Sequence, residues 1–141
     1  MIVNWIIGST DAHAKNYSIF IGQNNSFQLT PFYDVMSFFP YVGTSKNKIY
    51  ESKLKLAMAA RGIHGNKYGI NQIARSNWVL TGKYLGLSER ITQNIIEDVI
   101  EMTPIALDKT NNDLPKDFPT NISNPITTFV NKYLKRLKIS T

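Results

Sequence analysis

The spacing of apolar residues in the second half of the chain limits the possible folds more than any other sequence feature. Across residues 88–110 the apolar side chains recur at helical intervals, at Ile91, Ile95, Ile96, Val99, Ile100 and Met102. Ser88 is a suitable N-cap for this helix, and Pro104 predicts that the helix kinks or divides. Further helices are expected over 70–76, 77–85 and 121–138. We therefore expect a helical bundle whose core includes this isoleucine stripe, together with Trp5 and Trp78.

The first half of the chain predicts less helix and one small sheet. Residues 2–7 are interpreted as a short helix that Gly8 closes. Two short strands over 17–21 and 27–30 flank the turn-forming stretch GQNNS, which predicts a β-hairpin. A single hairpin is too small to form a core, so we expect it to lie on the helices. The fold class is therefore mainly α (α+β). The remaining segments are an irregular aromatic run over 31–42, a mobile loop over 43–53, an apolar run of ambiguous state over 54–60 and a glycine-rich loop over 61–69.

The composition is that of a globular chain with a basic surface. With 141 residues and 43% hydrophobic content, the chain is expected to form a single domain over residues 1–141. It has no cysteine, which excludes disulfides and thiolate metal sites. A net charge of +6 is compatible with nucleic-acid binding, but a solvated lysine-rich surface explains it equally well. No stretch reaches the roughly 18 apolar residues of a membrane span, and the first residues lack a basic leader, so a cytoplasmic protein is expected.

A dense polar stretch, DAHAKN at residues 11–16, separates the first apolar segment from the first strand. Asp11 and Asn16 have the spacing D-x-x-x-x-N, and Asp34 follows the hairpin. Such a set can bring a proton-accepting carboxylate and two metal-binding oxygens to one phosphoryl-transfer site. The alternative is a structural role, because Asp and Asn side chains often bond to their own backbone in turns. The residues alone leave both interpretations open.

The longer strings around these residues resemble a known family. The stretch NWIIGSTDAHAKNYSIFI, followed by LTPFYDVMS, resembles the C-terminal lobe of HipA-like serine/threonine kinases, the toxins of bacterial toxin–antitoxin systems. The resemblance continues through KLAMA, SNW, PIALD and LPKDFP, and so covers nearly the whole chain. It implies a kinase-like C-terminal lobe in which the hairpin carries the catalytic and metal-binding loops, and it implies Mg²⁺ and ATP as cofactors.

The resemblance also implies a role for each polar residue. Asp11 corresponds to the catalytic base, and the Mg²⁺ ligands correspond to Asn16 and Asp34. His13 lies two residues after Asp11, where it could face the transferred phosphate, although a loop-ordering role fits equally well. Lys15, in the same loop, is assigned a supporting role at the cofactor site.

Two parts of a kinase do not occur in this sequence. It contains no G-x-G-x-x-G loop and no strand lysine of the V-A-I-K type. We therefore expect the C-terminal part of a HipA-like Ser/Thr kinase toxin, active only when an N-lobe is supplied by a separate chain or a longer parent. The apolar start, MIVNWIIG, likewise suggests that another segment packs against it.

By family analogy the substrate is a protein hydroxyl, for example on an aminoacyl-tRNA synthetase, and the partner is a DNA-binding antitoxin. The alternative function is an inactive interaction module, derived from the kinase lobe, that binds a partner kinase, an antitoxin or a host protein.

The basic end of the chain offers a third possibility. Nucleic acid could be bound by Lys132, Lys135, Arg136 and Lys138, but the apolar residues between them favour a helix docked on the bundle. We therefore expect no direct nucleic-acid binding and no membrane association. His64, in the glycine-rich loop, is expected to be solvated. We expect the aromatic run to pack beneath the polar loop or in part to face a partner; it comprises Phe32, Tyr33, Phe38, Phe39 and Tyr41.

Overall fold

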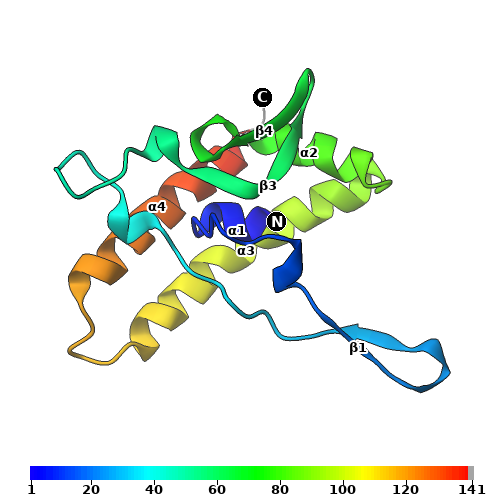
Figure 1. Cartoon of the computed structure of the whole chain (residues 1–141), viewed down its shortest axis with the longest axis horizontal. Helices are drawn as coiled ribbons and strands as arrows, with labels where there is room; N and C mark the ends of the chain where they lie inside the picture. The colour runs from blue at the N-terminus through cyan, green and yellow to red at the C-terminus, as the bar shows by residue number, and fades with distance from the viewer. Residues whose placement is uncertain (140–141) are drawn as a thin grey trace.

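Four α-helices form the body of the molecule (Figure 1). The computed structural model describes residues 1–139. The helices are α1 (Ile2–Ile6), α2 (Arg75–Tyr84), α3 (Glu89–Asp113) and α4 (Thr120–Lys138). The helices expected over 77–85 and 121–138 are confirmed within two residues, whereas 70–76 forms only a 3-10 turn and the start of α2. The 3-10 turns are Ala14–Asn16, Gln23–Asn25, Phe39–Tyr41, Glu51–Lys53 and Ile70–Gln72.

Two antiparallel hairpins accompany the helices, where the sequence predicted one. The expected hairpin pairs β1 (Ile19–Ile21) with β2 (Phe27–Leu29). The second hairpin pairs β3 (Lys55–Gly62) with β4 (Gly65–Gly69). The loop assignment for 61–69 is therefore wrong, and the undecided run over 54–60 is mostly strand. The structure is still of the expected α+β class, with small antiparallel sheets beside the helices.

Contacts with α2 explain why β3 is a strand. The N–H of Arg61 donates to Thr81 Oγ1 at 2.9 Å, and the Asn77 side-chain amide donates to the Arg61 carbonyl at 2.9 Å. On the inner face, Leu56 and Ala60 are buried. A short apolar run has no period that separates helix from strand, so these tertiary contacts decide its state.

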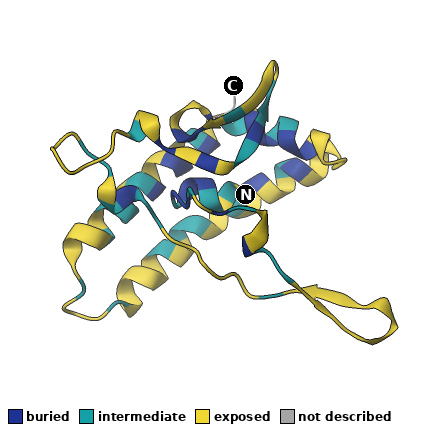
Figure 2. Ribbon diagram, viewed as in Figure 1, coloured by how far each residue is buried: buried dark blue, intermediate teal, exposed yellow. Residues whose placement is uncertain are grey.

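The first hairpin projects away from the helices (Figure 1), and all six strand residues are exposed (Figure 2). Ile21 and Phe27, which face each other across the ladder, are 80% and 77% exposed. At its base, the Thr30 N–H donates to the Ser18 carbonyl at 3.0 Å. Our expectation that it lies on the helices is wrong, since both faces of its two strands are exposed.

The core forms where α1 packs against the other helices and β3 (Figure 2). The Trp5 ring makes edge contacts with Trp78 at 5.8 Å and Tyr133 at 5.0 Å between ring centroids. Its indole N–H donates to the Ile70 carbonyl at 2.9 Å, so the only polar atom of the Trp5 side chain is satisfied. The prediction that Trp5 and Trp78 are core residues is confirmed.

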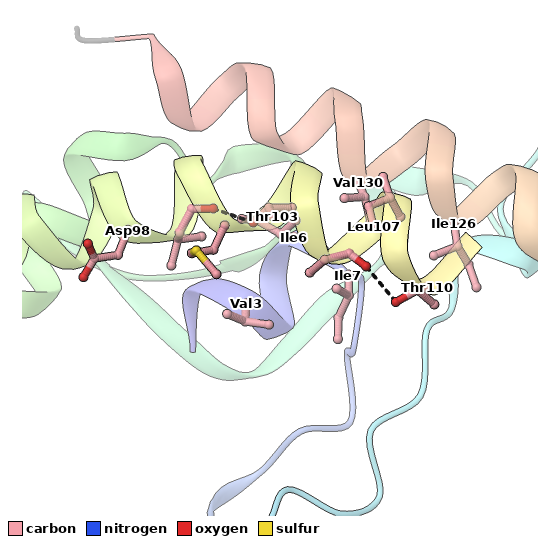
Figure 3. Close-up of a pocket in the computed structure, with 12 residues that line it drawn as sticks. Val3, Ile6, Ile7, Asp98, Thr103, Leu107, Thr110, Ile126 and Val130 are labelled. Atoms are coloured by element: carbon pink, nitrogen blue, oxygen red, sulfur yellow. Dashed lines mark hydrogen bonds between the residues drawn. The ribbon is translucent and has the colours of Figure 1, made fainter. Parts of the chain in front are cut away.

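The long helix α3 is continuous through Pro104, so the expected division there does not occur. Ser88 caps it as predicted, since its hydroxyl accepts the Ile91 N–H at 3.3 Å. The isoleucine stripe is only partly core: Ile96 is fully buried, whereas Met102 is 59% exposed. The exposed part of the stripe borders an open apolar groove, which residues of α1 and α4 also line (Figure 3).

The basic helix α4 is docked on the bundle, as expected, through Val130, Tyr133, Leu134 and Leu137. Its Tyr133 hydroxyl and Lys132 ammonium both donate to the Glu51 carboxylate, at 2.6 and 2.7 Å. Burial alone would raise the pKa of Glu51, but these two hydrogen bonds hold it below its ordinary value. Burial and the Glu51 charge raise the pKa of Tyr133.

None of the helices within residues 1–139 has the length and hydropathy that a membrane crossing requires.

Candidate functional site

A glycine turn at the end of α1 directs the chain into the polar loop. Gly8 has a φ of +67°, in the left-handed region that glycine tolerates best. A Cβ atom at this position would lie 2.7 Å from the Phe39 ring. The turn is fixed by two backbone hydrogen bonds, from Phe38 N–H to the Gly8 carbonyl at 3.0 Å and from Ser9 N–H to the Asn4 carbonyl at 2.8 Å. Both the backbone conformation and the close packing therefore require glycine.

The loop that follows is anchored on α1 and on β3. The Thr10 carbonyl accepts a hydrogen bond from the Ala57 N–H at 2.8 Å. The Asn4 side-chain amide of α1 donates to the Tyr17 hydroxyl at 2.6 Å. Side chains on a loop that is tied to rigid elements at both ends are held in place better than side chains on a free loop.

The central contact of the site joins Asn16 to Asp34. Asn16 ends the 3-10 turn and is only 7% exposed. Its side-chain Nδ2 donates to Asp34 Oδ2 at 2.9 Å. Asp34 has a φ of +55°, an uncommon conformation for a residue with a side chain. The chain thus leaves the loop, passes through the hairpin and returns the Asp34 carboxylate to Asn16.

Tyr33 closes the base of the hairpin and was not assigned to the site from sequence. Its hydroxyl donates to the Lys15 carbonyl at 2.8 Å and shares a second hydrogen bond with Ser18 Oγ at 2.7 Å. These contacts tie the residue before Asp34 to the residues around Asn16. From its sequence context Tyr33 was expected to be a packing aromatic, and the only signal for a role at the site was its place next to Asp34 in PFYD.

The other predicted site residues lie in the same loop. Asp11 is exposed, and within residues 1–139 its carboxylate has no hydrogen-bond partner. Lys15 is also exposed, and only its backbone carbonyl takes part in the Tyr33 contact. His13 is half-buried, with a buried Nδ1 that has no partner among the described atoms. The indole nitrogen of Trp78 in the core is likewise without a partner among the described atoms, so this feature does not by itself separate the two roles considered for His13.

The oxygen atoms of the site suit a hard cation. Asn16 Oδ1 and Asp34 Oδ1 are both free of hydrogen bonds from the described residues, so each has lone pairs available. Amide and carboxylate oxygens are the ligands that Mg²⁺ prefers, and Mg²⁺ usually keeps several waters. The described residues contain no cluster of three or more His, Cys, Asp or Glu side chains suited to a metal. Two protein oxygens would leave most ligand positions of such an ion to water.

The aromatic run after the hairpin divides into a buried and an exposed part. Phe39 is fully buried and stacks on Phe129 at 4.6 Å. Phe32 and Tyr41 are 73% and 57% exposed, so they are not packed beneath the loop, and the alternative that part of the run faces a partner stays a prediction. His64 is exposed, as expected.

Two comparisons relate the chain to known proteins. A family model described as "HipA-like C-terminal domain" matches residues 1–107. Among solved structures, the chain aligns with HipA from Shewanella oneidensis MR-1, solved in a toxin–antitoxin complex with HipB and operator DNA, at a TM-score of 0.70. The two sequences are 23% identical, and the match covers 97% of this chain but 29% of the HipA chain. The fold is therefore shared, and this chain spans less than a third of the protein that it matches.

Proposed function

The chain belongs to the family of HipA-like C-terminal domains, and from this membership we propose that it supplies the base and the metal ligands of a Ser/Thr protein kinase. The observation that carries the proposal is the 2.9 Å contact between Asn16 and Asp34. It brings two of the three expected functional residues together although 18 positions separate them in the chain. A turn-capping role would need only contacts with neighbouring backbone, which this pair does not make.

Each residue has a defined part in the proposed reaction. The Asp11 carboxylate accepts the proton of a substrate hydroxyl while the hydroxyl oxygen bonds to the γ-phosphorus of ATP and ADP leaves. Asn16 and Asp34 would hold Mg²⁺, which supplies charge neutralisation at the phosphates when bound. His13 would face the transferred phosphate, and Lys15 would support nucleotide binding from the same loop.

The proposed kinase needs a second lobe. The sequence contains neither a glycine-rich phosphate loop nor a strand lysine, and positioning of the phosphates supplies most of the rate in phosphoryl transfer. We propose that a separate chain or a longer parent provides these parts. The exposed hairpin beside the site, with Phe20 at 60% and Phe27 at 77% exposed, supports a partner surface at this position.

The proposed setting is a cytoplasmic toxin–antitoxin system. Because the related HipA structure was solved together with HipB, we propose that an antitoxin also binds the protein to which this chain belongs. The proposed substrate is a protein hydroxyl, with an aminoacyl-tRNA synthetase as the family precedent. The identity of the substrate rests on the family and not on these residues.

The metal part of the proposal can be tested on this chain alone. Added Mn²⁺, a paramagnetic substitute for Mg²⁺, should broaden the amide NMR signals of residues 11–18 and 33–35 before any others. Asn16→Ala and Asp34→Ala should each remove the broadening. Asp117→Asn, which changes an exposed acid between α3 and α4, should leave it intact. Broadening that is unaffected by the two site variants would contradict the assignment.

The catalytic part requires the complementing lobe. Phosphate transfer from labelled ATP should appear only when the lobe with the glycine-rich loop and the strand lysine is present. Asp11→Asn should then abolish transfer while leaving lobe binding unchanged. Activity that survives Asp11→Asn would exclude this carboxylate as the base.

The exposed hairpin also favours a second function, a non-catalytic interaction module. Its β1 and β2 side chains form an apolar ribbon that no described residue covers. The triple variant with alanine at Asp11, Asn16 and Asp34 separates the two functions. Full cellular toxicity of this variant, with phosphate transfer lost, would favour the module, whereas loss of toxicity together with phosphate transfer would favour the kinase.

A further inference from the structure

The basic and acidic side chains of this chain are separated along the sequence. Residues 43–83 carry eight basic side chains and one acidic one, and residues 118–139 carry four basic side chains and no acidic one. The rest of the chain carries four basic and nine acidic side chains. The net charge of +6 is therefore the difference between two strongly basic segments and a net acidic remainder.

The fold joins the two basic segments where the 3-10 turn Ile70–Gln72, which follows β4, meets the last turns of α4 (Figure 1). Arg136 of α4 donates to the Asn71 carbonyl of this turn at 2.7 Å. The Lys67 ammonium of β4 lies 3.5 Å from the carbonyl oxygen of Gln72 in the same turn. Cations that are 69 positions apart in the sequence, at 67 and 136, are therefore attached to neighbouring residues.

Glu51, the one acidic residue of these segments, does not cancel their charge. Its carboxylate accepts hydrogen bonds from the Lys132 ammonium at 2.7 Å and from the Tyr133 hydroxyl at 2.6 Å. Lys53, in the same 3-10 turn as Glu51, is exposed and has no ion-pair partner within residues 1–139. Only one cation is thus paired here, and the surface keeps a net positive charge.

Arg61 of β3 extends the row of cations beyond Lys67. Its guanidinium donates to the side chain of Asn66, the residue before Lys67, at 2.7 Å. The same guanidinium lies 4.1 Å from the centroid of the Tyr84 ring. We call these five cations the basic surface: Lys53, Arg61, Lys67, Lys132 and Arg136.

Exposed aromatic rings accompany the cations at both ends of the basic surface. Tyr50 is 53% exposed, and Lys53 Nζ lies 5.8 Å from its ring centroid. Tyr84, beside Arg61, is 66% exposed. Aromatic rings among cations suit single-stranded nucleic acid, because bases stack on the rings while the cations bind phosphates. A duplex keeps its bases stacked on one another and an acidic peptide has none, so the rings favour a single strand.

From this arrangement we propose that the basic surface binds single-stranded RNA or DNA, with its cations on the phosphates and with Tyr50 and Tyr84 against bases. This departs from the expectation of no nucleic-acid binding that was drawn from the sequence. That expectation set a docked α4 against a nucleic-acid surface, but α4 docks through apolar residues while its cations lie beside those of other segments. The inference does not depend on phosphoryl transfer.

The binding test uses the whole chain and two fluorescently labelled strands of about 12 nucleotides, oligo(U) and oligo(dT). Saturable binding of either strand in an anisotropy titration at low salt supports the proposal, and the tighter strand identifies the source of the ligand. The log–log salt slope of the affinity should be about −2 to −4, since each phosphate bound on a single strand contributes about −0.7. An unlabelled duplex and polyglutamate should each compete at least about 5-fold less well per charge, because neither offers a free base.

Two double variants locate the charge that matters. Lys53→Ala with Lys67→Ala should weaken binding about 5-fold or more and reduce the salt slope by about 1.4. Lys109→Ala with Lys116→Ala is the control, since it removes the same charge from exposed positions outside the two basic segments. The control should change the affinity less than about 2-fold. Circular dichroism checks that both proteins keep their helix content.

Two single variants test the ring. Tyr50→Leu should weaken binding of the preferred strand about 5-fold or more. Phe20→Leu is its control, because Phe20 is 60% exposed on the first hairpin, where residues 17–30 contain no basic side chain. The control should leave the affinity unchanged.

Three results would overturn the proposal. Competition by the duplex or by polyglutamate that equals that of the single strands would show that bases are not bound. Equal loss in the two double variants would show that overall charge, and not this surface, attracts the strand. Equal affinities of Tyr50→Leu and Phe20→Leu would exclude stacking at Tyr50.

Discussion

Replacing Gly8 with alanine should destabilise the protein through two separable effects. The first is conformational, because an alanine at a φ of +67° lies in the left-handed region and costs about 1 to 2 kcal/mol. The second is steric, because the new Cβ would lie 2.7 Å from two carbons of the Phe39 ring. That ring cannot move freely, since it is fully buried and stacked between Phe129 and Tyr133 at centroid distances of 4.6 and 5.6 Å.

Overpacking of a tight core costs about 1 to 3 kcal/mol, so the two effects together amount to roughly 2 to 5 kcal/mol. With a urea m-value of about 1.5 kcal/mol/M for a chain of this size, the unfolding midpoint should fall by roughly 1 to 3 M. Gly86→Ala provides the matched control. Gly86 has a φ of +80° with nothing within 4 Å of an added Cβ, so it should show the conformational cost alone.

Urea unfolding followed by tryptophan fluorescence measures both variants, with Trp5 and Trp78 as core reporters. Gly8→Ala in a Phe39→Leu background should cost no more than Gly86→Ala, because the shorter side chain leaves room for the methyl group. The reasoning is refuted if Gly8→Ala and Gly86→Ala cost the same in the otherwise unchanged protein. It is refuted equally if the cost at Gly8 does not depend on the residue at position 39.

The remaining predictions concern the side-chain hydrogen bonds of Tyr33 and Glu51. Tyr33→Phe removes the donor to the Lys15 carbonyl and should lower the free energy of unfolding by about 0.5 to 1.5 kcal/mol. Amide hydrogen exchange should become faster at residues 14–18. Tyr41→Phe is the control: this tyrosine is exposed and its hydroxyl has no described hydrogen bond, so exchange at residues 14–18 should stay unchanged. Glu51→Gln tests the acid dependence of folding. Because hydrogen bonds lower the folded-state pKa of Glu51 below 4.5, its contribution is present above that value and is lost as the pH falls through the lowered pKa. The stability advantage of the original chain over Glu51→Gln should therefore be smaller at pH 3 than at pH 7, as measured by urea midpoints, and an advantage of equal size at both pH values would contradict this.

The helices were largely predictable because their determinants are local. The stripe over residues 88–110, the Ser88 cap and the basic amphipathic segment over 121–138 each describe an element that the structure contains. Pro104 does not divide helix α3, which passes through it without a break. The family, too, could be predicted, because long contiguous strings around DAHAKN and further blocks along the chain carry the resemblance.

The positions of the two hairpins could not be predicted, because they depend on contacts between distant segments. The strand β3 pairs with β4 and is hydrogen-bonded to α2 at Arg61, whereas both faces of the first hairpin stay exposed. A two-residue period says which side chains share a face but not what lies opposite that face.

The sequence by itself determined the helices, the glycine turn after α1 and the kinds of side chain in the polar loop. Only the tertiary structure decided that Asn16 meets Asp34, that Tyr33 fastens the loop, and that Arg136 of α4 meets the 3-10 turn after β4. The physical reason is the sequence separation of the interacting residues. Helix caps and periodic patterns depend on residues a few positions apart, whereas these contacts join distant segments and arise from the packing of whole elements.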